Sequence, residues 1–275
     1  MKKISIYTIA LIVFLILYST WIVSQMNTIQ LSYDESRHAA GGMLWYDYIK
    51  TIAHDGYMPF KQFINQYQQM GYNAGWFVNI DPPVDGLIRA PFYALFGPTF
   101  FSVRLMALFS AIISGILTYI IAYKITKRRP VALASTIILL MSTLVFMYTA
   151  IQALDAMPTI MTGLFWYYFT FVREPKKKYL FRLGKAEFAF TWNLVWGGLA
   201  LTAATLIKYP AALFIDLFFV LYAIYLFVAR YRQVKQFNLS LFTESGVLQI
   251  AFTAVVQNLI FLAISWKWLQ YNLFE

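Results

Sequence analysis

Seven long apolar segments constrain this chain more than any other feature of its sequence. They cover approximately residues 4–24, 102–123, 131–151, 157–172, 190–207, 210–229 and 247–268. A helix needs roughly 20 mostly apolar residues to cross a bilayer, and the fourth segment is the shortest of the set. Because lipid offers no partner to a free backbone amide or carbonyl, such segments fold as helices. The sequence therefore predicts an all-α integral membrane protein with about seven transmembrane helices.

The composition excludes several other classes of protein. Of the 275 residues, 60% are hydrophobic and only 12% are charged, whereas an average soluble domain is about 25% charged. A chain with so few charges cannot cover the surface of a soluble enzyme, and it is too apolar to be disordered. It contains no cysteine, which excludes a disulfide framework, a thiolate metal site and a cysteine nucleophile.

The first apolar segment follows Lys2 and Lys3, as the core of a signal peptide would. It is too long for that role, and no cleavage site made of small residues follows before Gln25. We therefore expect an uncleaved membrane anchor.

The basic residues predict the orientation in the membrane. Most of the 22 Lys and Arg residues fall at the N-terminus or in three short connections, at 124–129, 173–185 and 230–235. Positive loops remain on the cytoplasmic side, so we expect a cytoplasmic N-terminus, an outer C-terminus and a prokaryotic plasma membrane. The net charge of +10 then needs no nucleic acid partner. The alternative for one cluster, Lys176–Lys178, is binding of a phosphate.

The acidic residues fall on the opposite side of the predicted bilayer. Seven of the 12 lie in the loop over residues 26–101 or at the next outer turn: Asp34, Glu35, Asp47, Asp55, Asp81, Asp85 and Asp155. The pattern of this loop predicts an amphipathic helix over 33–52 and a short helix over 60–70. An irregular segment is expected from Gly71 to the Pro82-Pro83 pair. We expect a single membrane module over 1–275 whose active site lies in this outer loop.

The start of the first loop helix carries a cluster suited to acid–base chemistry. Asp34 lies in the first turn, where the helix dipole favours a carboxylate, and Arg37 and His38 follow at helical spacing on the same face. A carboxylate can take a proton while a guanidinium binds phosphate oxygens. Two alternatives stay open: Asp34 is a solvated first-turn acid, and Glu35 forms a capping box with Ser32.

Five ordered motifs resemble the GT-C glycosyltransferases, in the branch that includes protein O-mannosyltransferases and lipid A aminoarabinose transferases. These motifs are Asp34-Glu35-Ser36-Arg37-His38-Ala39, Asp81-Pro82-Pro83-Val84, the stretch 94–105 that ends at Arg104-Leu105, Ala153-Leu154-Asp155-Ala156-Met157-Pro158, and the stretch 197–210 that contains Lys208-Tyr209-Pro210. The resemblance covers roughly residues 5–230. It departs from the family pattern at Asp81, where relatives often carry a basic residue or His.

The resemblance implies a membrane enzyme that transfers a sugar from a polyprenyl-phosphate donor to an acceptor hydroxyl on the outer face, with inversion. Asp34 would be the catalytic carboxylate. Arg37, Arg104 and Lys208 would be candidates to bind the lipid phosphate, and Asp155 matches a family acid that faces the outer cavity. Glu35 and His38, beside Asp34, are further expected substrate-binding residues. Relatives usually continue beyond seven spans, so a second subunit or a further C-terminal region is an expected partner. The alternative function is a non-catalytic subunit, or half of a split glycosyltransferase, that binds lipid or a partner protein.

The charges at the outer ends of the spans also allow structural explanations. Lys208 could snorkel to the interface, Asp155 could cap the fourth span, and Arg104 could anchor to head groups. Charges within a membrane are functional candidates by default, and the common depth of these groups with Asp34 and Arg37 favours a site. For Asp216, within the sixth span, a structural partner from a neighbouring polar residue is expected.

No metal site is indicated by ligand spacing. The two histidines, His38 and His54, give no zinc pattern. Carboxylates beside a phosphate would suit Mg²⁺ or Mn²⁺, so a divalent cation is an open possibility rather than a prediction.

Overall fold

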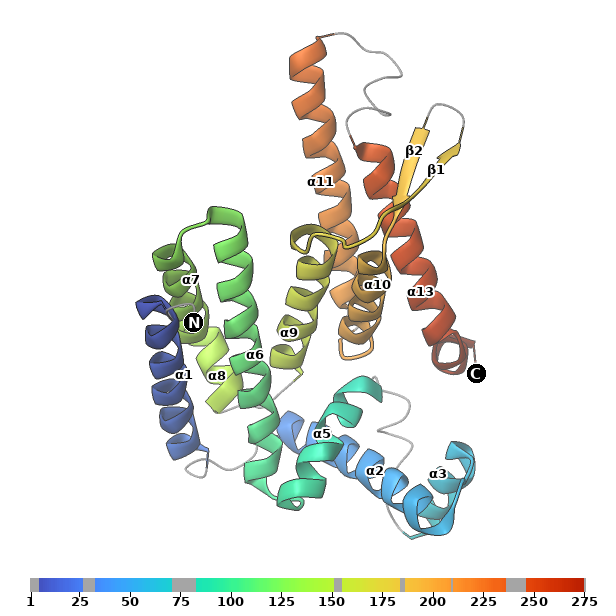
Figure 1. The fold of residues 1–275 in the computed structure, drawn as a ribbon. Helices are drawn as coiled ribbons and strands as arrows, with labels where there is room; N and C mark the ends of the chain where they lie inside the picture. Colours follow the sequence, from blue (N-terminus) through green and yellow to red (C-terminus); the bar gives the residue numbers. More distant parts are fainter. Residues whose placement is uncertain are drawn as a thin grey trace. The chain divides into compact units, whose positions relative to one another are not determined.

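A computed structural model describes residues 5–26, 33–70, 83–150, 155–183, 186–208, 210–235 and 246–274 (Figure 1). The chain forms two compact units. Unit 1 comprises residues 1–164 with 206–208, and unit 2 comprises residues 165–205 with 209–275.

Unit 1 contains the N-terminal helices and the loop that the sequence places outside the membrane. Its helices are α1 (Ile6–Gln25), α2 (Tyr33–Asp55), α3 (Phe60–Gln69), α5 (Pro83–Phe96), α6 (Phe100–Thr126), α7 (Arg129–Met141), α8 (Thr143–Ala150) and the first part of α9 (Ala156–Tyr167). The core between α1, α6, α7, α8 and the start of α9 is apolar, with Ile22, Leu108, Leu140 and Met157 among its buried members. In a bilayer such side chains hold helices together by van der Waals packing, because lipid is as apolar as they are.

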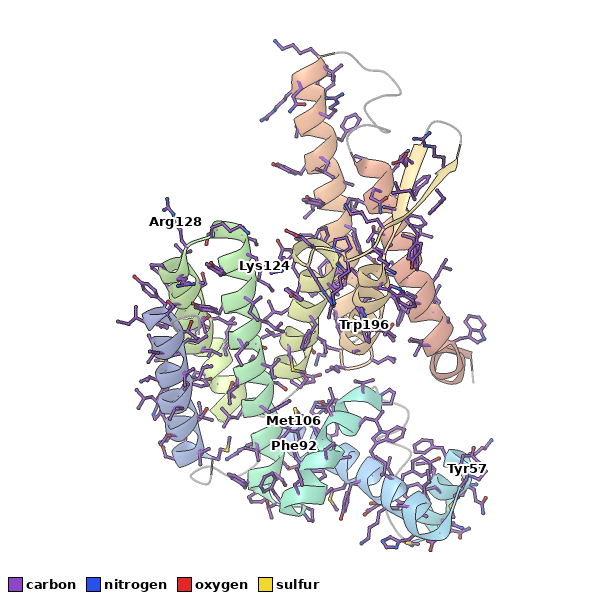
Figure 2. The ribbon with its side chains drawn as sticks, in the orientation of Figure 1. Tyr57, Phe92, Met106, Lys124, Arg128 and Trp196 are labelled. Atoms are coloured by element: carbon purple, nitrogen blue, oxygen red, sulfur yellow. The ribbon has the colours of Figure 1, made fainter. Side chains whose placement is uncertain are left out.

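The described part of the loop over residues 26–101 contains a helix that the sequence did not predict. Helices α2 and α3 confirm the two predicted stretches within three residues at each end. Helix α5 covers Pro83–Phe96, although Pro83 and Pro91 are unfavourable to helices in sequence terms. Pro83 is the first residue of the helix, where its missing N–H costs nothing. Phe92 of α5 and Met106 of α6 lie on adjoining helices (Figure 2), and Phe92 contacts Phe109 edge to face.

The third apolar segment is bent rather than straight. Helices α7 and α8 meet at an angle of 60°. The break is at Ser142, whose backbone is extended and whose hydroxyl donates to the carbonyl of Leu139 at 2.8 Å. A side chain that competes for a helical carbonyl is an ordinary cause of a kink.

Unit 2 contains a helical bundle and a β-hairpin. After α9 the chain forms a π-helix, η1 (Tyr168–Val172), and the antiparallel strands β1 (Tyr179–Leu183) and β2 (Ala186–Phe190), then α10 (Trp192–Thr205), α11 (Pro210–Val234) and α13 (Val247–Phe274). The hairpin was not predicted. Phe181 and Phe188 face each other across its strands and both contact Phe252 of α13, so the hairpin is stabilised by packing on a helix.

The fold class is confirmed as an all-α membrane protein with this small hairpin. Four described helices are long and apolar enough to span a bilayer, namely α1, α6, α11 and α13, and the bent pair α7–α8 would be a fifth. The number seven stays a prediction, because α9 and α10 have only 12 and 14 residues. The expected partner of Asp216 is confirmed: Asn258 of α13 donates to its carboxylate at 2.9 Å.

Candidate active site

The first turn of α2 carries the predicted catalytic residue, Asp34. Its backbone is helical, as the sequence predicts, while its side chain and Ser32 lie outside the described residues. The neighbouring side chains show how this turn is held. Glu35 is fully buried, His38 is almost fully buried and Arg37 is partly exposed.

Glu35 forms a buried ion pair with Arg104 of α6. The Nε and Nη2 atoms of Arg104 donate to the two carboxylate oxygens of Glu35 at 2.8 and 3.2 Å, and both side chains are 0% exposed. Arg104 also donates to the carbonyl of Met26 at the end of α1. A bidentate guanidinium–carboxylate pair has a defined geometry, so it fixes the first turn of α2 against α6.

His38 forms a second buried contact, with Asp85 of α5. Its Nδ1 lies 3.0 Å from Oδ2 of Asp85, and Arg89 donates to the same carboxylate from Nε at 2.9 Å and from Nη2 at 3.2 Å. Burial by itself raises the pKa of Asp85. The charge of Arg89 and the contacts with His38 outweigh burial and lower this pKa to about 2. Asp85 is therefore a carboxylate at neutral pH.

Helices α2 and α5 approach closely beside this network. A Cβ added to Gly42 would lie 2.7 Å from Tyr93 and 2.8 Å from Arg89, so only glycine fits there. The hydroxyl of Tyr93 donates to the carbonyl of Ala39 at 2.9 Å. Burial raises the pKa of Tyr93 to about 12. The phenol consequently keeps its proton and acts as a structural donor between the two helices.

A third ion pair joins the chain on either side of the inserted segment of unit 2. Nζ of Lys208 lies 2.7 Å from Oδ2 of Asp155, and the Lys208 side chain is 51% exposed while that of Asp155 is 7% exposed. The carbonyl of Leu206 accepts from the backbone N–H of Val84, next to Asp85. This bond places Lys208 and Asp155 beside the start of α5, on the same part of unit 1 as the Asp85 network.

The structure thus brings most of the predicted site residues into two pairs. Glu35 is with Arg104, and Asp155 is with Lys208. His38 contacts Asp85, which together with Arg89 was not predicted as a site residue. Their spacing of four residues, typical of a helical ion pair, was the available signal. Asp155 directly precedes α9, the position that the capping alternative requires, and its carboxylate is paired with Lys208.

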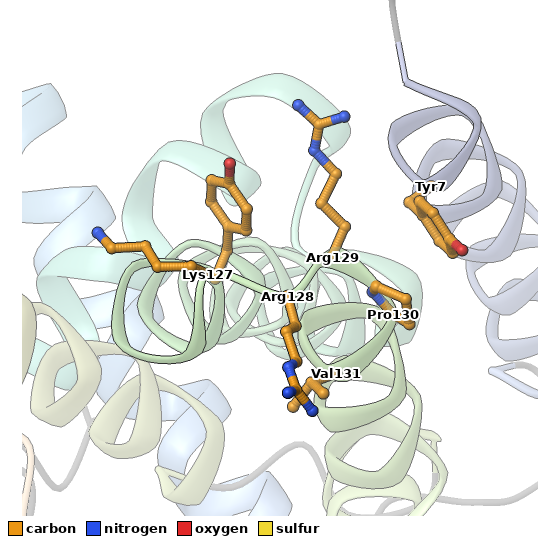
Figure 3. A pocket seen from close by; sticks show the side chains of 7 residues that line it. Tyr7, Lys127, Arg128, Arg129, Pro130 and Val131 are labelled. Atoms are coloured by element: carbon orange, nitrogen blue, oxygen red, sulfur yellow. The ribbon is translucent and has the colours of Figure 1, made fainter.

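The described residues contain no group of three His, Asp or Glu side chains that could hold a metal ion. A cavity of about 580 Å³ lies at the other end of α6, lined by Lys127, Arg128, Arg129 and Tyr7 among others (Figure 3). Arg104 and Lys127 are about 35 Å apart along α6 at 1.5 Å per residue. This cavity is therefore separate from the three ion pairs.

Comparison with known proteins places the chain in a family. No curated protein and no solved structure matches it. A family model described as dolichyl-phosphate-mannose-protein mannosyltransferase matches residues 67–273, about three quarters of the chain. The matched range contains Asp85, Arg104, Asp155 and Lys208 and begins after Asp34. It agrees with the resemblance drawn from the five motifs. The chain belongs to the dolichyl-phosphate-mannose-protein mannosyltransferase family, a membrane glycosyltransferase family of the GT-C superfamily.

Proposed function

We propose that this protein transfers a sugar from a polyprenyl-phosphate donor to an acceptor hydroxyl on the outer side of the membrane. Mannose is the first sugar to test, because it is the sugar in the family's description. One observation carries the proposal beyond the family match. Two fully or nearly fully buried charged contacts, Glu35–Arg104 and His38–Asp85, hold the turn of α2 on which Asp34 lies. Buried charges are costly unless they are paired. Here the paired charges fix the position of the first turn of α2.

In the proposed reaction Asp34 is the general base. The acceptor hydroxyl gives its proton to the Asp34 carboxylate while its oxygen forms a bond to the anomeric carbon of the sugar. The bond between the anomeric carbon and the phosphate oxygen breaks on the opposite face, and its electron pair leaves with the lipid phosphate. One displacement of this kind inverts the configuration. Since phosphate is a good leaving group, positioning and charge stabilisation supply most of the catalysis.

The cations of the site divide into two roles in this proposal. Lys208 is half exposed beside Asp155, and Arg37 is partly exposed one turn after Asp34. Because both are accessible, we assign them to the phosphate of the donor. Arg104 is fully buried against Glu35, so we assign this pair, with His38, to positioning α2 rather than to contact with the donor.

A direct test compares turnover by three forms of the full chain. Wild type, Asp34→Asn and the control Asp55→Asn are purified and incubated with radiolabelled polyprenyl-phosphate mannose and a hydroxyl-bearing peptide. Asp55 is an exposed aspartate in the last turn of the same helix. We expect Asp34→Asn to lose at least about a hundredfold in turnover and Asp55→Asn to match wild type.

The outcomes separate the enzyme from the alternative function. Wild-type turnover that survives Asp34→Asn would overturn the role of Asp34. Donor binding by wild type without turnover would favour a subunit that needs a partner. An absence of both binding and turnover with mannose and with other polyprenyl-phosphate sugars would overturn the proposed function.

A further inference from the structure

We propose that unit 2 binds the head-group phosphate of an anionic phospholipid, in a cavity at the C-terminal end of η1. The cavity has a volume of about 230 Å³, and its lining consists of Arg173, Pro175, Lys176, Lys177, Trp192, Asn193 and Trp196. Three of these seven residues are cations and none is an acid. The proposal does not depend on the proposed glycosyltransferase function.

The backbone places Arg173 at this cavity through an irregular helix end. The N–H of Arg173 donates to the carbonyl of Tyr168 at 2.8 Å, which is the wide bond of a π-turn. The side chain of Asn193, which is only 8% exposed, donates to the carbonyl of Arg173 at 2.6 Å. Single π-turns are uncommon and are frequent at functional sites. The backbone of Arg173 is therefore held at both its N–H and its carbonyl group.

Aromatic rings fix the direction of the Arg173 side chain. Its guanidinium carbon lies 5.2 Å from the centre of the Phe169 ring, and Phe169 is stacked with Trp196 at 6.1 Å. Trp196 is labelled in Figure 2. A guanidinium placed over an aromatic face loses little further freedom when it binds a planar or tetrahedral anion.

The cations of the cavity take no part in ion pairs within the described part of the chain, and Glu174, next to Arg173 in sequence, is exposed and outside the lining. None of the described carboxylates forms an ion pair with Arg173, Lys176 or Lys177, while the nearby Glu187 is paired with Arg182 at 2.8 Å. An adjoining cavity of about 260 Å³ shares Arg173 and adds Lys178. Clusters of cations next to a membrane helix attract anionic head groups.

An apolar surface on α10 leads away from these cations. Trp192, Trp196 and Leu199 are 62%, 49% and 37% exposed and lie at i, i+4 and i+7 on one face of the helix. Tryptophan is typical of the level where head groups meet acyl chains. A cationic cavity that continues into an apolar helix face matches a lipid, with its phosphate at Arg173 and its acyl chains along α10. A free phosphate would leave the apolar face unused.

The cavity at the α6–α7 connection offers a matched control. It also has three cations in its lining, Lys127, Arg128 and Arg129, and the guanidinium of Arg129 lies 5.7 Å from the ring of Tyr123 (Figure 3). Arg128 and Arg129 are exposed, as are Lys176 and Lys177. Removal of two charges at either place changes the net charge of the protein equally.

The test measures lipid binding to the purified full chain by native mass spectrometry. Short-chain phosphatidylglycerol, short-chain phosphatidylcholine and inorganic phosphate are titrated separately into wild type, Lys176→Gln/Lys177→Gln and Arg128→Gln/Arg129→Gln. We expect phosphatidylglycerol to bind wild type more tightly than phosphatidylcholine, and inorganic phosphate not to displace it. The Lys176/Lys177 variant should lose on the order of tenfold in affinity, and the Arg128/Arg129 variant less than about twofold.

Each of the following outcomes would contradict the proposed site or the identity of its ligand. Equal losses in the two variants would mean that net charge alone attracts the lipid. Equal binding of the two phospholipids would exclude recognition of the anion, and displacement by inorganic phosphate would make a soluble phosphate the ligand. The variant Lys176→Arg/Lys177→Arg keeps the charge and should bind as wild type does, so a loss there would also contradict the proposal.

Discussion

The guanidinium of Arg104 lies 2.8 Å from the carboxylate of Glu35, with both side chains 0% exposed and the two residues 69 positions apart in the chain. This contact connects the long span α6 to the first turn of α2, next to Asp34. A buried pair of this kind contributes little net stability compared with an apolar pair, but the loss of one partner leaves a charge in an apolar environment. It therefore acts as a constraint on where α2 begins.

Substitution of Arg104 alone should destabilise the protein strongly. We expect Arg104→Met to lower the free energy of unfolding by about 3–5 kcal/mol, because Glu35 stays buried without this cation. The double variant Glu35→Leu/Arg104→Met should recover a large part of that loss. Thermal unfolding of the detergent-purified protein measures both, with the exposed Lys61→Met as control. A double variant no more stable than Arg104→Met would contradict the explanation.

The Asp85 network should make stability depend on acid pH. The pKa of Asp85 falls from 3.8 in the unfolded chain to about 2 in the folded protein, which corresponds to about 2 kcal/mol of stability. Because the folded-state pKa is the lower one, this contribution is fully present above about pH 4 and is lost as the pH falls toward 2.

The pH dependence is measured as a difference between two proteins. The gap in unfolding free energy between wild type and Asp85→Asn should narrow as the pH falls from about 4 toward 2. The exposed Asp55→Asn should show no such change. A gap that stays constant down to pH 2 would mean that the charge of Asp85 does not stabilise the fold.

Lys208 should affect donor binding more than stability. Its ion pair with Asp155 is half exposed, and pairs in contact with solvent contribute about 0–1 kcal/mol. We expect Lys208→Gln to unfold within about 1 kcal/mol of wild type and to raise the KM for the polyprenyl-phosphate donor roughly tenfold or more, as a lost charge-assisted contact would. Lys61→Gln, in α3, is the control. An unchanged KM would remove Lys208 from the phosphate site.

The adjacent glycines Gly41 and Gly42 should respond in opposite directions to the same substitution. A methyl group at Gly42 would meet Tyr93 and Arg89 at less than 3 Å, while one at Gly41 would meet nothing within 4 Å. Gly42→Ala should destabilise the protein by about 1–3 kcal/mol through overpacking. Gly41→Ala should stabilise it by up to about 1 kcal/mol through helix propensity. Thermal unfolding measures both, and equal effects would contradict the close approach of α2 and α5.

Several features could be predicted from sequence because their physical causes are local. Hydropathy over about 20 residues identifies segments that can cross a bilayer, and within the described residues helices occupy most of each predicted range, although the fifth begins in β2 and the number of spans stays a prediction. The pattern around Tyr33 and Phe60 predicted α2 and α3, and the motif order predicted the family. Asp34 was correctly expected in the first turn of a helix, since this depends only on the residues that follow it.

The partners of the charged residues depended on tertiary structure. Glu35 is an N3 capping candidate in sequence, yet its carboxylate is bound by Arg104 because the packing of α2 on α6 buries both. His38 lies 47 residues from Asp85. The prolines around Asp85 argued against a helix there, and so the helix that brings the two residues together was not predicted. The bend at Ser142, by contrast, accompanies a local hydrogen bond from its hydroxyl to the carbonyl of Leu139. The sequence alone thus determined which segments are apolar, which are helical and where the charges lie. Only the packing of the helices decided which buried charges meet. The reason is that an ion pair requires atoms within a few ångströms of each other, and residues distant in sequence can satisfy this only in the folded chain.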